Sequence, residues 1–355
     1  MKVDRRKFIK YAGGAALMSL TDAHQLMAAG SFPLTDGDTP INVIIPKNFS
    51  PRIDYESKQY QYQLTRATLD FLQDNFSNQK MPIWRKRFGE VDFEKRITNI
   101  VYWVVRAVKE HQNIYPIDPV WVIGQIMKES YFYEYAVSSS LAMGICQFIQ
   151  PTAEEYKMLC AGSRDAHHRS PFKLTKYADM ANEYYRLRRE RNRYRRSNRP
   201  KKRYTLEEAL EIIDRNDVKN HRKDAAAYLR YLRRVEDYLA QMREARENFR
   251  EYLRRNLDGR NIFNENDLQF ILNFDERFTY RKPAFSMVKM MTRALRARNG
   301  NILAAAIGYN AGLSSTIDEG MYEPYGKIPP NEQATTYISH VLINHYEITR
   351  RMGNI

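Results

Sequence analysis

Residues 118–130 read DPVWVIGQIMKES and carry a clear helix signal. Asp118 is a good N-cap, and Pro119 suits the first helical turn because its missing N–H would be unpaired there anyway. The apolar residues of this stretch include Val120, Trp121, Ile123, Ile126 and Met127. We therefore expect a largely apolar helix that ends near Glu129 and Ser130.

The residues before this stretch also favour helices. Apolar positions recur at helical spacing over 56–76 and over 93–112, which is typical of helices with one buried face. Residues 31–54 carry Pro33, Pro40, Pro46 and Pro51, so we interpret them as a linker or an extended arm. No alternating apolar run of useful length occurs, and the sequence therefore predicts a mostly α-helical protein.

The composition excludes several classes of protein. A chain of 355 residues has room for one or two domains. Its 43% hydrophobic content excludes disorder throughout, and its two Cys exclude a disulfide scaffold. It has no long charge-free apolar run, which excludes a multi-span membrane protein. The formal net charge of +15 favours an anionic partner without identifying it.

Short motifs occur at the end of the predicted helix and after it, in two separated segments of the chain. They are Lys128-Glu129-Ser130, the run SSSLAMGICQ from Ser138 to Gln147, Pro151-Thr152-Ala153, and the run AAAIGYNAG from 304 to 312. Each motif alone is typical of a turn or a helix end. Together, and in this order, they resemble the catalytic domain of the soluble lytic transglycosylases, which are relatives of goose-type lysozyme. Ser138 follows Glu129 by nine residues and Gln147 follows it by eighteen, as the family spacing requires.

Glu129 is the candidate catalytic residue. Cleaving a glycosidic bond requires a proton on the leaving oxygen, and a carboxylic acid supplies it near neutral pH only if its pKa is raised. Glu129 ends an apolar helix and precedes the aromatic run 131–133, where burial would raise the pKa. The resemblance implies that Glu129 is the single acid/base that cleaves the MurNAc–GlcNAc bond and forms 1,6-anhydro-MurNAc. The enzyme would then be formally a lyase.

The resemblance also implies a set of substrate-binding residues. Tyr309 would approach the catalytic acid and the sugar, and Asn310 would hold that loop or contact substrate. Ser138 would hydrogen-bond near the sugar C6, Gln147 would bind the acetamide or the glycan backbone, and Ile149 would line the groove. No metal-ligand spacing and no nucleotide-binding motif is present in the sequence, so we expect no metal and no cofactor.

The chain departs from the family pattern at several positions. Leu141 stands where the family usually has Gly, so we expect that loop to take a different course. Near the C-terminus, the chain resembles the family's Pro-x-x-Glu-Thr-x-x-Tyr-Val motif. When Tyr337 is aligned with its Tyr, Gln333 takes the place of the usual Glu and Glu332 precedes it by one residue.

Two structural assignments remain open at this point. Tyr131 and Tyr133 either stack on sugar faces or pack in the core. Cys146, which replaces the family's usual Met, either pairs with Cys160 in a disulfide or stays a free thiol.

Residues 161–260 differ from the rest in composition. Between Tyr185 and Tyr204 there are eleven Lys or Arg and one acidic residue. Further along, apolar residues step by four and three, which is coiled-coil spacing: Tyr228, Leu232, Val235, Leu239 and Met242. We therefore expect a basic helical hairpin. It is either a solvated, salt-bridged helix pair or a docking surface for an anionic polymer, a membrane, or a cell-wall or secretion-machinery protein through residues 185–256.

The N-terminus reads MKVDRRKFIK, and a short apolar stretch and small residues follow it. These features describe an export signal, and the order Arg-Arg-Lys-Phe-Ile-Lys resembles the twin-arginine translocation consensus. We expect a periplasmic protein, and export argues against nucleic acid as a partner. The predicted parts are a signal peptide at 1–30, an arm and helix at 31–91, a transglycosylase core at 92–160 and 261–355, and the basic helical insertion at 161–260.

The expected substrate is the glycan strand of peptidoglycan, and two alternatives remain open. A hydrolytic muramidase on the same fold would need a second carboxylate or a positioned water. A catalytically inactive peptidoglycan-binding scaffold would use the insertion as its working part. The resemblance therefore implies an all-α, lysozyme-like domain with a long basic helical insertion.

Overall fold

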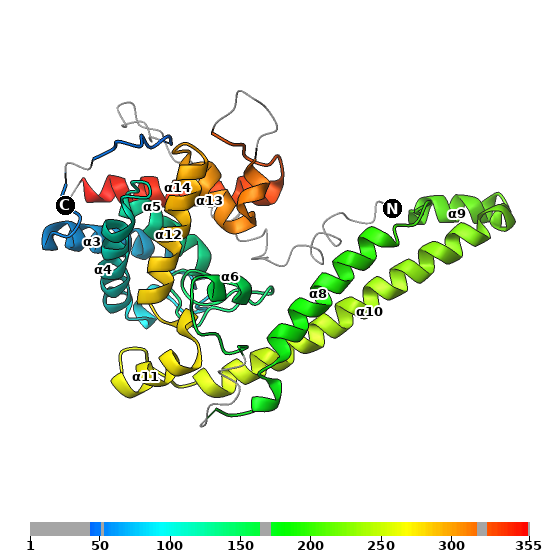
Figure 1. The fold of residues 1–355 in the computed structure, drawn as a ribbon, viewed down its shortest axis with the longest axis horizontal. Helices are drawn as coiled ribbons and strands as arrows, with labels where there is room; N and C mark the ends of the chain where they lie inside the picture. The colour runs from blue at the N-terminus through cyan, green and yellow to red at the C-terminus, as the bar shows by residue number, and fades with distance from the viewer. Residues whose placement is uncertain (1–42, 51–52, 164–171, 318–324, 354–355) are drawn as a thin grey trace. The chain divides into compact units, whose positions relative to one another are not determined.

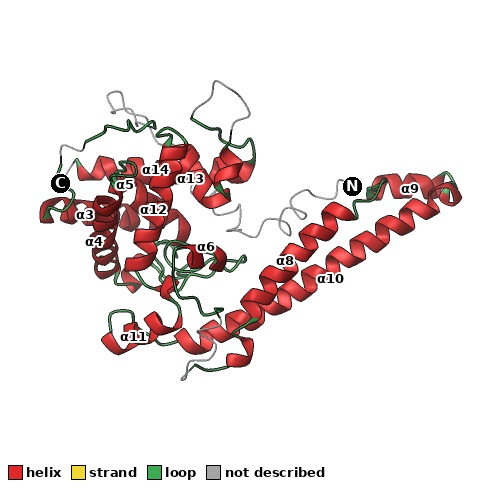
Figure 2. Cartoon of the chain, viewed as in Figure 1, coloured by secondary structure: helices red, strands yellow, loops and turns green. Residues whose placement is uncertain are grey.

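The computed structural model describes residues 43–50, 53–163, 172–317 and 325–353. Helices dominate this part of the chain, which contains isolated bridges but no β-strand (Figure 2). The prediction of an all-α fold is confirmed. Within the same ranges, no helix has both the length and the apolar character needed to cross a membrane. The predicted export signal at 1–30 lies outside the described residues.

The chain divides into two compact units. In the described ranges, the larger unit comprises residues up to 137 together with 143–158 and 275–353, and the smaller unit comprises 138–142 and 159–274. The helices of the larger unit are α3 Lys58–Phe76, α4 Phe93–His111, α5 Pro119–Ser130, α6 Gln150–Glu155, α12 Arg281–Ala297, α13 Ile302–Ala311 and α14 Glu332–Met352 (Figure 1). Short 3-10 turns accompany them: η1 Phe88–Glu90, η3 Glu276–Phe278 and η4 Leu313–Thr316. The proposed domain boundaries stay a prediction.

The helix predicted from residues 118–130 is α5, and it is almost entirely buried. Its N-cap forms as expected, because the Asp118 carboxylate accepts a 2.8 Å hydrogen bond from the Val120 N–H. Val122, Ile123 and Ile126 have no exposed surface, and burying each such side chain contributes about 1.5–3 kcal/mol. The helix packs against α4 and α14. The helices expected at 56–76 and 93–112 are α3 and α4, so those predictions are also confirmed.

Helix α14 lies close against α5 because Gly124 has no side chain. A Cβ at Gly124 would lie only 3.2 Å from the backbone nitrogen of His345. Asn344 Nδ2 donates a 2.9 Å hydrogen bond to the Gly124 carbonyl, and the His345 ring stacks on Trp121 with a centroid separation of 3.7 Å. These contacts determine how α14 is placed along α5.

Helix α5 ends directly after Glu129 and Ser130. Tyr131 and Phe132 have φ values of +48° and +62°, a left-handed conformation that side chains rarely adopt and that stops the helix. The Trp84 indole N–H donates a 2.8 Å hydrogen bond to the Tyr131 carbonyl. The Tyr131 ring is buried edge-on against Phe76. Of the two roles left open for Tyr131, the structure therefore shows core packing.

The smaller unit contains a long helical hairpin. The elements of this unit are η2 Thr175–Tyr177, α8 Met180–Ser197, α9 Leu206–Asp214, α10 Val218–Leu257 and α11 Glu265–Phe274. Helices α8 and α10 lie side by side, and α9 connects them at the tip (Figure 1). That this hairpin is an insertion into a transglycosylase core stays a prediction.

The apolar stripe predicted on α10 is only partly buried: Met242 is buried, and Tyr228, Val235 and Leu239 are partly exposed. Leu232, expected in the seam, is 40% exposed, whereas Tyr231 and Tyr238 are buried. Both tyrosines lie against Tyr194 of α8, with ring centroids 5.9 Å and 6.1 Å apart. The large rings bury more surface than leucine would and so decide which face of α10 meets α8.

Candidate active site

Glu129 lies in the last turn of α5 with its side chain partly exposed. Burial raises the pKa of Glu129 to about 7 from its ordinary value of 4.5, although a hydrogen bond from Tyr337 and the charge of Lys128 both oppose the rise. A carboxyl with this pKa is present in both protonation states near neutral pH. It is therefore able to give up a proton and to take one back.

Tyr337 of α14 contacts the Glu129 carboxyl directly. Its hydroxyl donates a 2.6 Å hydrogen bond to Glu129 Oε1, and the described residues give no hydrogen bond to Oε2. Burial and the neighbouring Glu129 raise the pKa of Tyr337 well above its ordinary value, so the phenol stays protonated and acts as a donor. Tyr337 was predicted only as the aligned tyrosine of the C-terminal motif, and no local pattern marked it as a site residue.

The acidic residue that the C-terminal motif leads one to expect does not contact Glu129. Glu332 is the first residue of α14 and Gln333 is the second, and both side chains are exposed. Neither forms a hydrogen bond to Glu129. In this chain the residue of that motif that reaches the carboxyl is the tyrosine.

Tyr309 of α13 joins the same group of residues. Its hydroxyl donates a 2.6 Å hydrogen bond to the Cys146 carbonyl. Burial raises the pKa of Tyr309 well above its ordinary value, and the nearby Cys146, Glu129 and Tyr337 raise it further. The structure therefore brings Tyr309 close to Glu129, although its hydroxyl bonds to a backbone carbonyl. Asn310 follows in the last turn of α13, partly exposed and without a side-chain hydrogen bond to the described residues.

The loop 143–148 lies beside the end of α5. The Ser130 hydroxyl donates a 2.9 Å hydrogen bond to the Ile145 carbonyl, which ties the loop to the helix. Gln147 has φ +50°, and its Nε2 donates to the carbonyls of Gly144 at 2.9 Å and Ala136 at 3.3 Å. Both amide protons of Gln147 are thereby used inside the loop, which leaves Oε1 as its open acceptor. Ile149 is partly exposed at the N-cap of α6.

Gly144 is required by the packing of this loop. Its φ is +75°, and a Cβ there would lie 1.8 Å from the Arg277 carbonyl oxygen. Any side chain at this position would push the loop away from the segment that contains η3.

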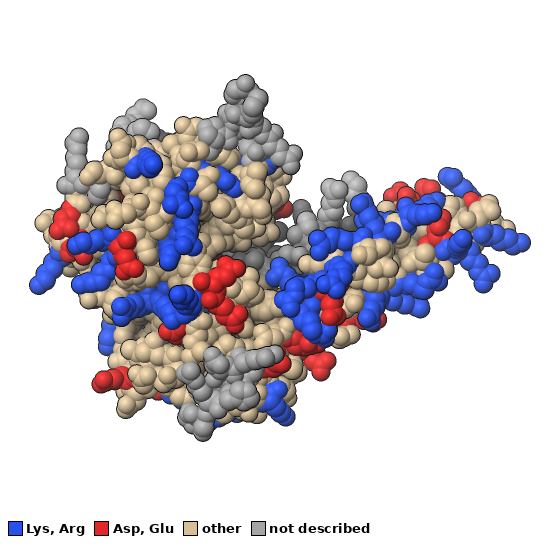
Figure 3. Space-filling view, viewed as in Figure 1, with Lys and Arg blue, Asp and Glu red and all other residues tan. Residues whose placement is uncertain are grey.

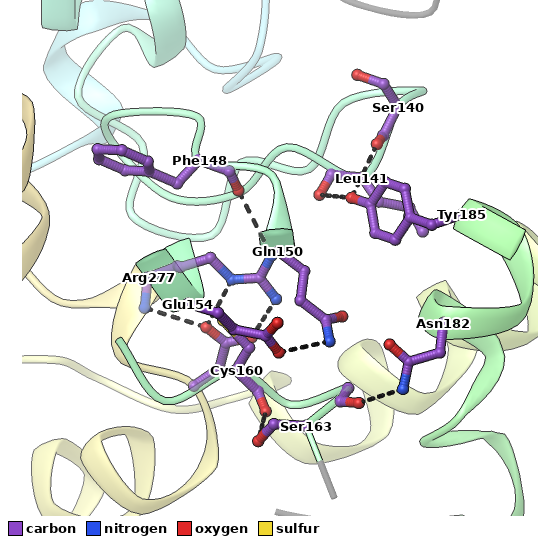
Figure 4. Close-up of polar contacts among 12 residues, drawn as sticks. Ser140, Leu141, Phe148, Gln150, Glu154, Cys160, Ser163, Asn182, Tyr185 and Arg277 are labelled. Carbon is purple, nitrogen blue, oxygen red and sulfur yellow. Dashed lines mark hydrogen bonds and ion pairs between the residues drawn. The ribbon is translucent and has the colours of Figure 1, made fainter. Parts of the chain in front are cut away.

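A buried ion pair supports the same loop from η3. Arg277 Nη2 lies 2.6 Å from Asp275 Oδ2, and neither side chain has any exposed surface. Arg277 Nη1 also donates a 3.4 Å hydrogen bond to the Phe148 carbonyl (Figure 4). Within α6, Gln150 Nε2 donates a 2.9 Å hydrogen bond to Glu154 Oε1 (Figure 4).

Ser138 belongs to the smaller unit, in the segment 138–142. Its hydroxyl accepts hydrogen bonds from the backbone N–H groups of Ala142 at 3.0 Å and Ser140 at 3.3 Å. Leu141 has φ +61° and is fully buried, so it adopts the left-handed conformation that glycine favours. The Tyr185 hydroxyl donates to the carbonyls of Ser140 and Leu141, each at 3.3 Å (Figure 4).

Both cysteines, Cys146 and Cys160, are free and buried, so of the two states left open the structure shows free thiols. Burial raises the pKa of the Cys146 thiol well above its ordinary value, which disfavours the reactive thiolate. The described residues contain no group of three or more His, Cys, Asp or Glu arranged to hold a metal ion.

Comparison with protein families identifies one domain. Residues 106–185 match the family model described as the transglycosylase SLT domain. This match supports a lysozyme-like domain of the lytic transglycosylase type, and the substrate class that such a domain implies is peptidoglycan. Comparisons with curated proteins and with solved structures gave no match. The matched range includes Glu129, Ser138, Gln147 and Ile149, whereas Tyr309, Asn310 and Tyr337 lie beyond it.

Proposed function

We propose that this protein is an exported lytic transglycosylase that uses Glu129 as its single acid/base. The observation that carries the proposal is the Glu129 carboxyl itself, with a pKa of about 7 and one oxygen held by Tyr337. The family match supports the class of reaction. The bond cleaved would be that between MurNAc and GlcNAc, and the product would be 1,6-anhydro-MurNAc.

In the first step, Glu129 acts as an acid. Because Tyr337 donates to Oε1, the acidic proton would reside on Oε2, which accepts no hydrogen bond from the described residues. Transfer of this proton to the glycosidic oxygen lets the bond between that oxygen and C1 of MurNAc break. The leaving GlcNAc gains its hydroxyl, and the MurNAc ring develops positive charge at C1.

In the second step, the Glu129 carboxylate acts as a base. It takes the proton of the MurNAc C6 hydroxyl while the C6 oxygen attacks C1, which closes the 1,6-anhydro ring. Glu129 ends the cycle protonated, so no water is consumed. Tyr337 stabilises the carboxylate between the two steps, since a hydrogen bond to a charged acceptor is worth about 1.5–3 kcal/mol.

The surroundings of Glu129 favour this route over hydrolysis. Lys128 is the charged neighbour that shifts its pKa, and no Asp or Glu from the described residues does so. A hydrolase would need a second carboxylate or a positioned water. Asp318, Glu319 and Glu323 lie outside the described residues, so the mass of the product is the decisive observation.

We propose binding roles for the residues around the acid. Gln147 Oε1 would accept from the N–H of a sugar acetamide, because its amide protons are already used in the loop. Tyr309 and Asn310 would line the sugar site from α13, and Ile149 would supply an apolar wall. Ser138 would act near C6. Export by the twin-arginine route to the periplasm is part of the proposal and rests on the N-terminal sequence.

The test is digestion of purified sacculi by the wild type, Glu129→Gln and the control Glu155→Gln, which changes an exposed carboxyl on α6. We expect muropeptides lighter by one water than reducing muropeptides from the wild type and the control, and none from Glu129→Gln. Reducing products would establish the muramidase instead. No release by the wild type, with sacculus binding retained by Glu129→Gln, would establish a binding scaffold.

A further inference from the structure

The tip of the hairpin carries an amphipathic helix, α9, that buries none of its residues. Leu206, Leu210 and Ile213 are 46%, 56% and 63% exposed. They occupy positions i, i+4 and i+7 and so share one face of the helix. Large aliphatic side chains aligned in this way expose an apolar row, Leu206-Leu210-Ile213, which the described residues of the smaller unit do not cover.

The helix forms for reasons independent of this row. The Thr205 hydroxyl accepts a 3.1 Å hydrogen bond from the Glu208 N–H, and the Glu208 carboxylate accepts a 2.7 Å bond from the Thr205 N–H. This capping box defines the start of α9. Ala209 and Ile212, the apolar residues on the neighbouring face, are only partly exposed.

The acidic residues of α9 do not lie on the apolar row. By helical geometry, Glu208 and Glu211 lie on the opposite face, and Glu207 and Asp214 lie on the flank next to Leu210. Glu208 is held in the capping box, and Glu211 Oε2 lies 3.8 Å from Arg215 Nη2. When the apolar row meets a surface, Glu208 and Glu211 point away from it, and Glu207 and Asp214 lie at the edge of the contact.

Basic residues flank α9 on both sides in the chain. All are exposed and form no ion pair with the described residues: Lys201 and Arg203 before the helix, and Lys219, Arg222 and Lys223 after it. Figure 3 shows Lys and Arg side chains gathered along this hairpin. Long basic side chains next to an apolar row keep their charges at the level of anionic head groups while their stems lie along apolar surface.

We propose that α9 docks this protein on a bilayer surface that contains anionic phospholipid. The apolar row would enter the boundary between head groups and acyl chains, and the flanking cations would contact phosphates, as in interfacial amphipathic helices. A stable protein interface buries about 800 Å² on each partner, whereas three aliphatic side chains on one short convex helix offer much less. A bilayer requires no matching groove, so charge and apolar character together favour lipid over a protein partner.

The test is sedimentation of the full chain with vesicles of phosphatidylcholine, with and without phosphatidylglycerol. All variants share one N-terminus, so differences between them report on the hairpin. Ile213→Ser is compared with Ile53→Ser, which removes a similarly exposed isoleucine (63% and 59%) from the larger unit. We expect Ile213→Ser to weaken binding to anionic vesicles, Ile213→Ser with Leu210→Ser to weaken it by about tenfold or more, and Ile53→Ser to leave it unchanged.

A second arm tests the charges. Lys219→Gln with Lys223→Gln should weaken binding to anionic vesicles by about tenfold at low salt, and the control Lys58→Gln with Lys80→Gln should not. Added salt should weaken wild-type binding and reduce the difference between the lysine variants. The α9 residues are already in water, so circular dichroism should show unchanged helix content in every variant.

Several results would overturn the proposal. One is that the wild type does not bind anionic vesicles, and another is that it binds neutral and anionic vesicles equally. A third is that the tip variants and their controls lose vesicle binding to the same extent. Retention by purified sacculi alone, lost in the tip variants, would assign the row to the cell wall instead. The proposed catalysis is tested separately, because Glu129→Gln should bind vesicles as the wild type does.

Discussion

The hydroxyl of Tyr337 donates a 2.6 Å hydrogen bond to Oε1 of Glu129, from a residue 208 positions away in the chain. Helices α5 and α14 bring the two groups together because Gly124 lets α14 pack closely against α5. The bond occupies one carboxyl oxygen, and the described residues give no hydrogen bond to the other. It also opposes the rise of the Glu129 pKa that burial causes.

Tyr337→Phe should raise the pKa of Glu129 further, because it removes a donor that favours the carboxylate. The alkaline limb of the pH–activity profile should therefore move to higher pH. Turnover at neutral pH should fall by roughly tenfold, since the carboxylate needed in the second step loses a bond worth about 1.5–3 kcal/mol. Tyr62→Phe, at an exposed tyrosine of α3, is the control. An unchanged profile would show that the bond does not tune the acid.

Glu129→Gln should stabilise the protein at alkaline pH. The pKa of Glu129 is about 7 in the folded state and near 4.5 ordinarily, so the folded protein binds more protons between these values and its stability falls as pH rises through them. At pH 8 the variant should be more stable than the wild type by about 3 kcal/mol, and below about pH 4.5 the two should agree. Urea unfolding at both pH values measures this. A constant difference at all pH values would contradict the assigned pKa.

Gln125→Leu should raise the free energy of unfolding and should also raise the pKa of Glu129. Gln125 lies one turn before Glu129, is fully buried, and its amide forms no hydrogen bond of ordinary geometry with the described residues. Replacing such an amide by an apolar side chain of similar size should add about 1 kcal/mol to the free energy of unfolding. The Gln125 amide also opposes the rise of the Tyr337 pKa that burial and Glu129 cause.

If Gln125 positions Tyr337, its loss should move the alkaline limb upward, but less than Tyr337→Phe does. In the Tyr337→Phe background the same substitution should have no further effect on the profile. Thermal unfolding and pH–activity profiles of the four proteins complete this cycle. A stability change without any shift in the profile would reduce Gln125 to a packing role.

Arg277→Met should destabilise the protein strongly. It would leave Asp275 charged and buried without its partner, and breaking such a pair costs about 3–5 kcal/mol. Because Arg277 also bonds the Phe148 carbonyl, activity should fall at temperatures where the variant is still folded. Arg66→Met breaks the exposed pair with Asp70 and should cost about 0.5 kcal/mol or less. Equal melting temperatures for the two variants would contradict this assignment.

The local elements around the site were predictable from sequence. Apolar spacing predicted α3, α4 and α5, and Asp118 with Pro119 predicted where α5 begins. The coiled-coil stripe predicted on α10 holds at Met242 but not at Leu232, because Tyr231 and Tyr238 turn toward α8 and pack against Tyr194. The spacing of apolar residues predicts the faces of a single helix, whereas the helix packed against it decides which face is buried.

The motif and the apolar helix predicted Glu129 and a raised pKa for it, but not the hydrogen bond that opposes the rise. The raised pKa depends on burial, and the opposing bond comes from Tyr337, which no local pattern connects to Glu129. The same holds for Gly144. Only the tertiary structure shows that a side chain there would collide with the Arg277 carbonyl.

Local sequence therefore specified the helices of the core, the candidate acid and the basic hairpin, because these depend on neighbours within a few residues. The contacts of Tyr337 with Glu129 and of Arg277 with Phe148 emerged only with the tertiary structure. So did the exposure of the apolar row on α9, since a sequence gives the pattern of a helix face but not whether another element covers it. Packing between distant segments sets burial, and burial sets both the pKa of an acid and the freedom of an apolar face to bind.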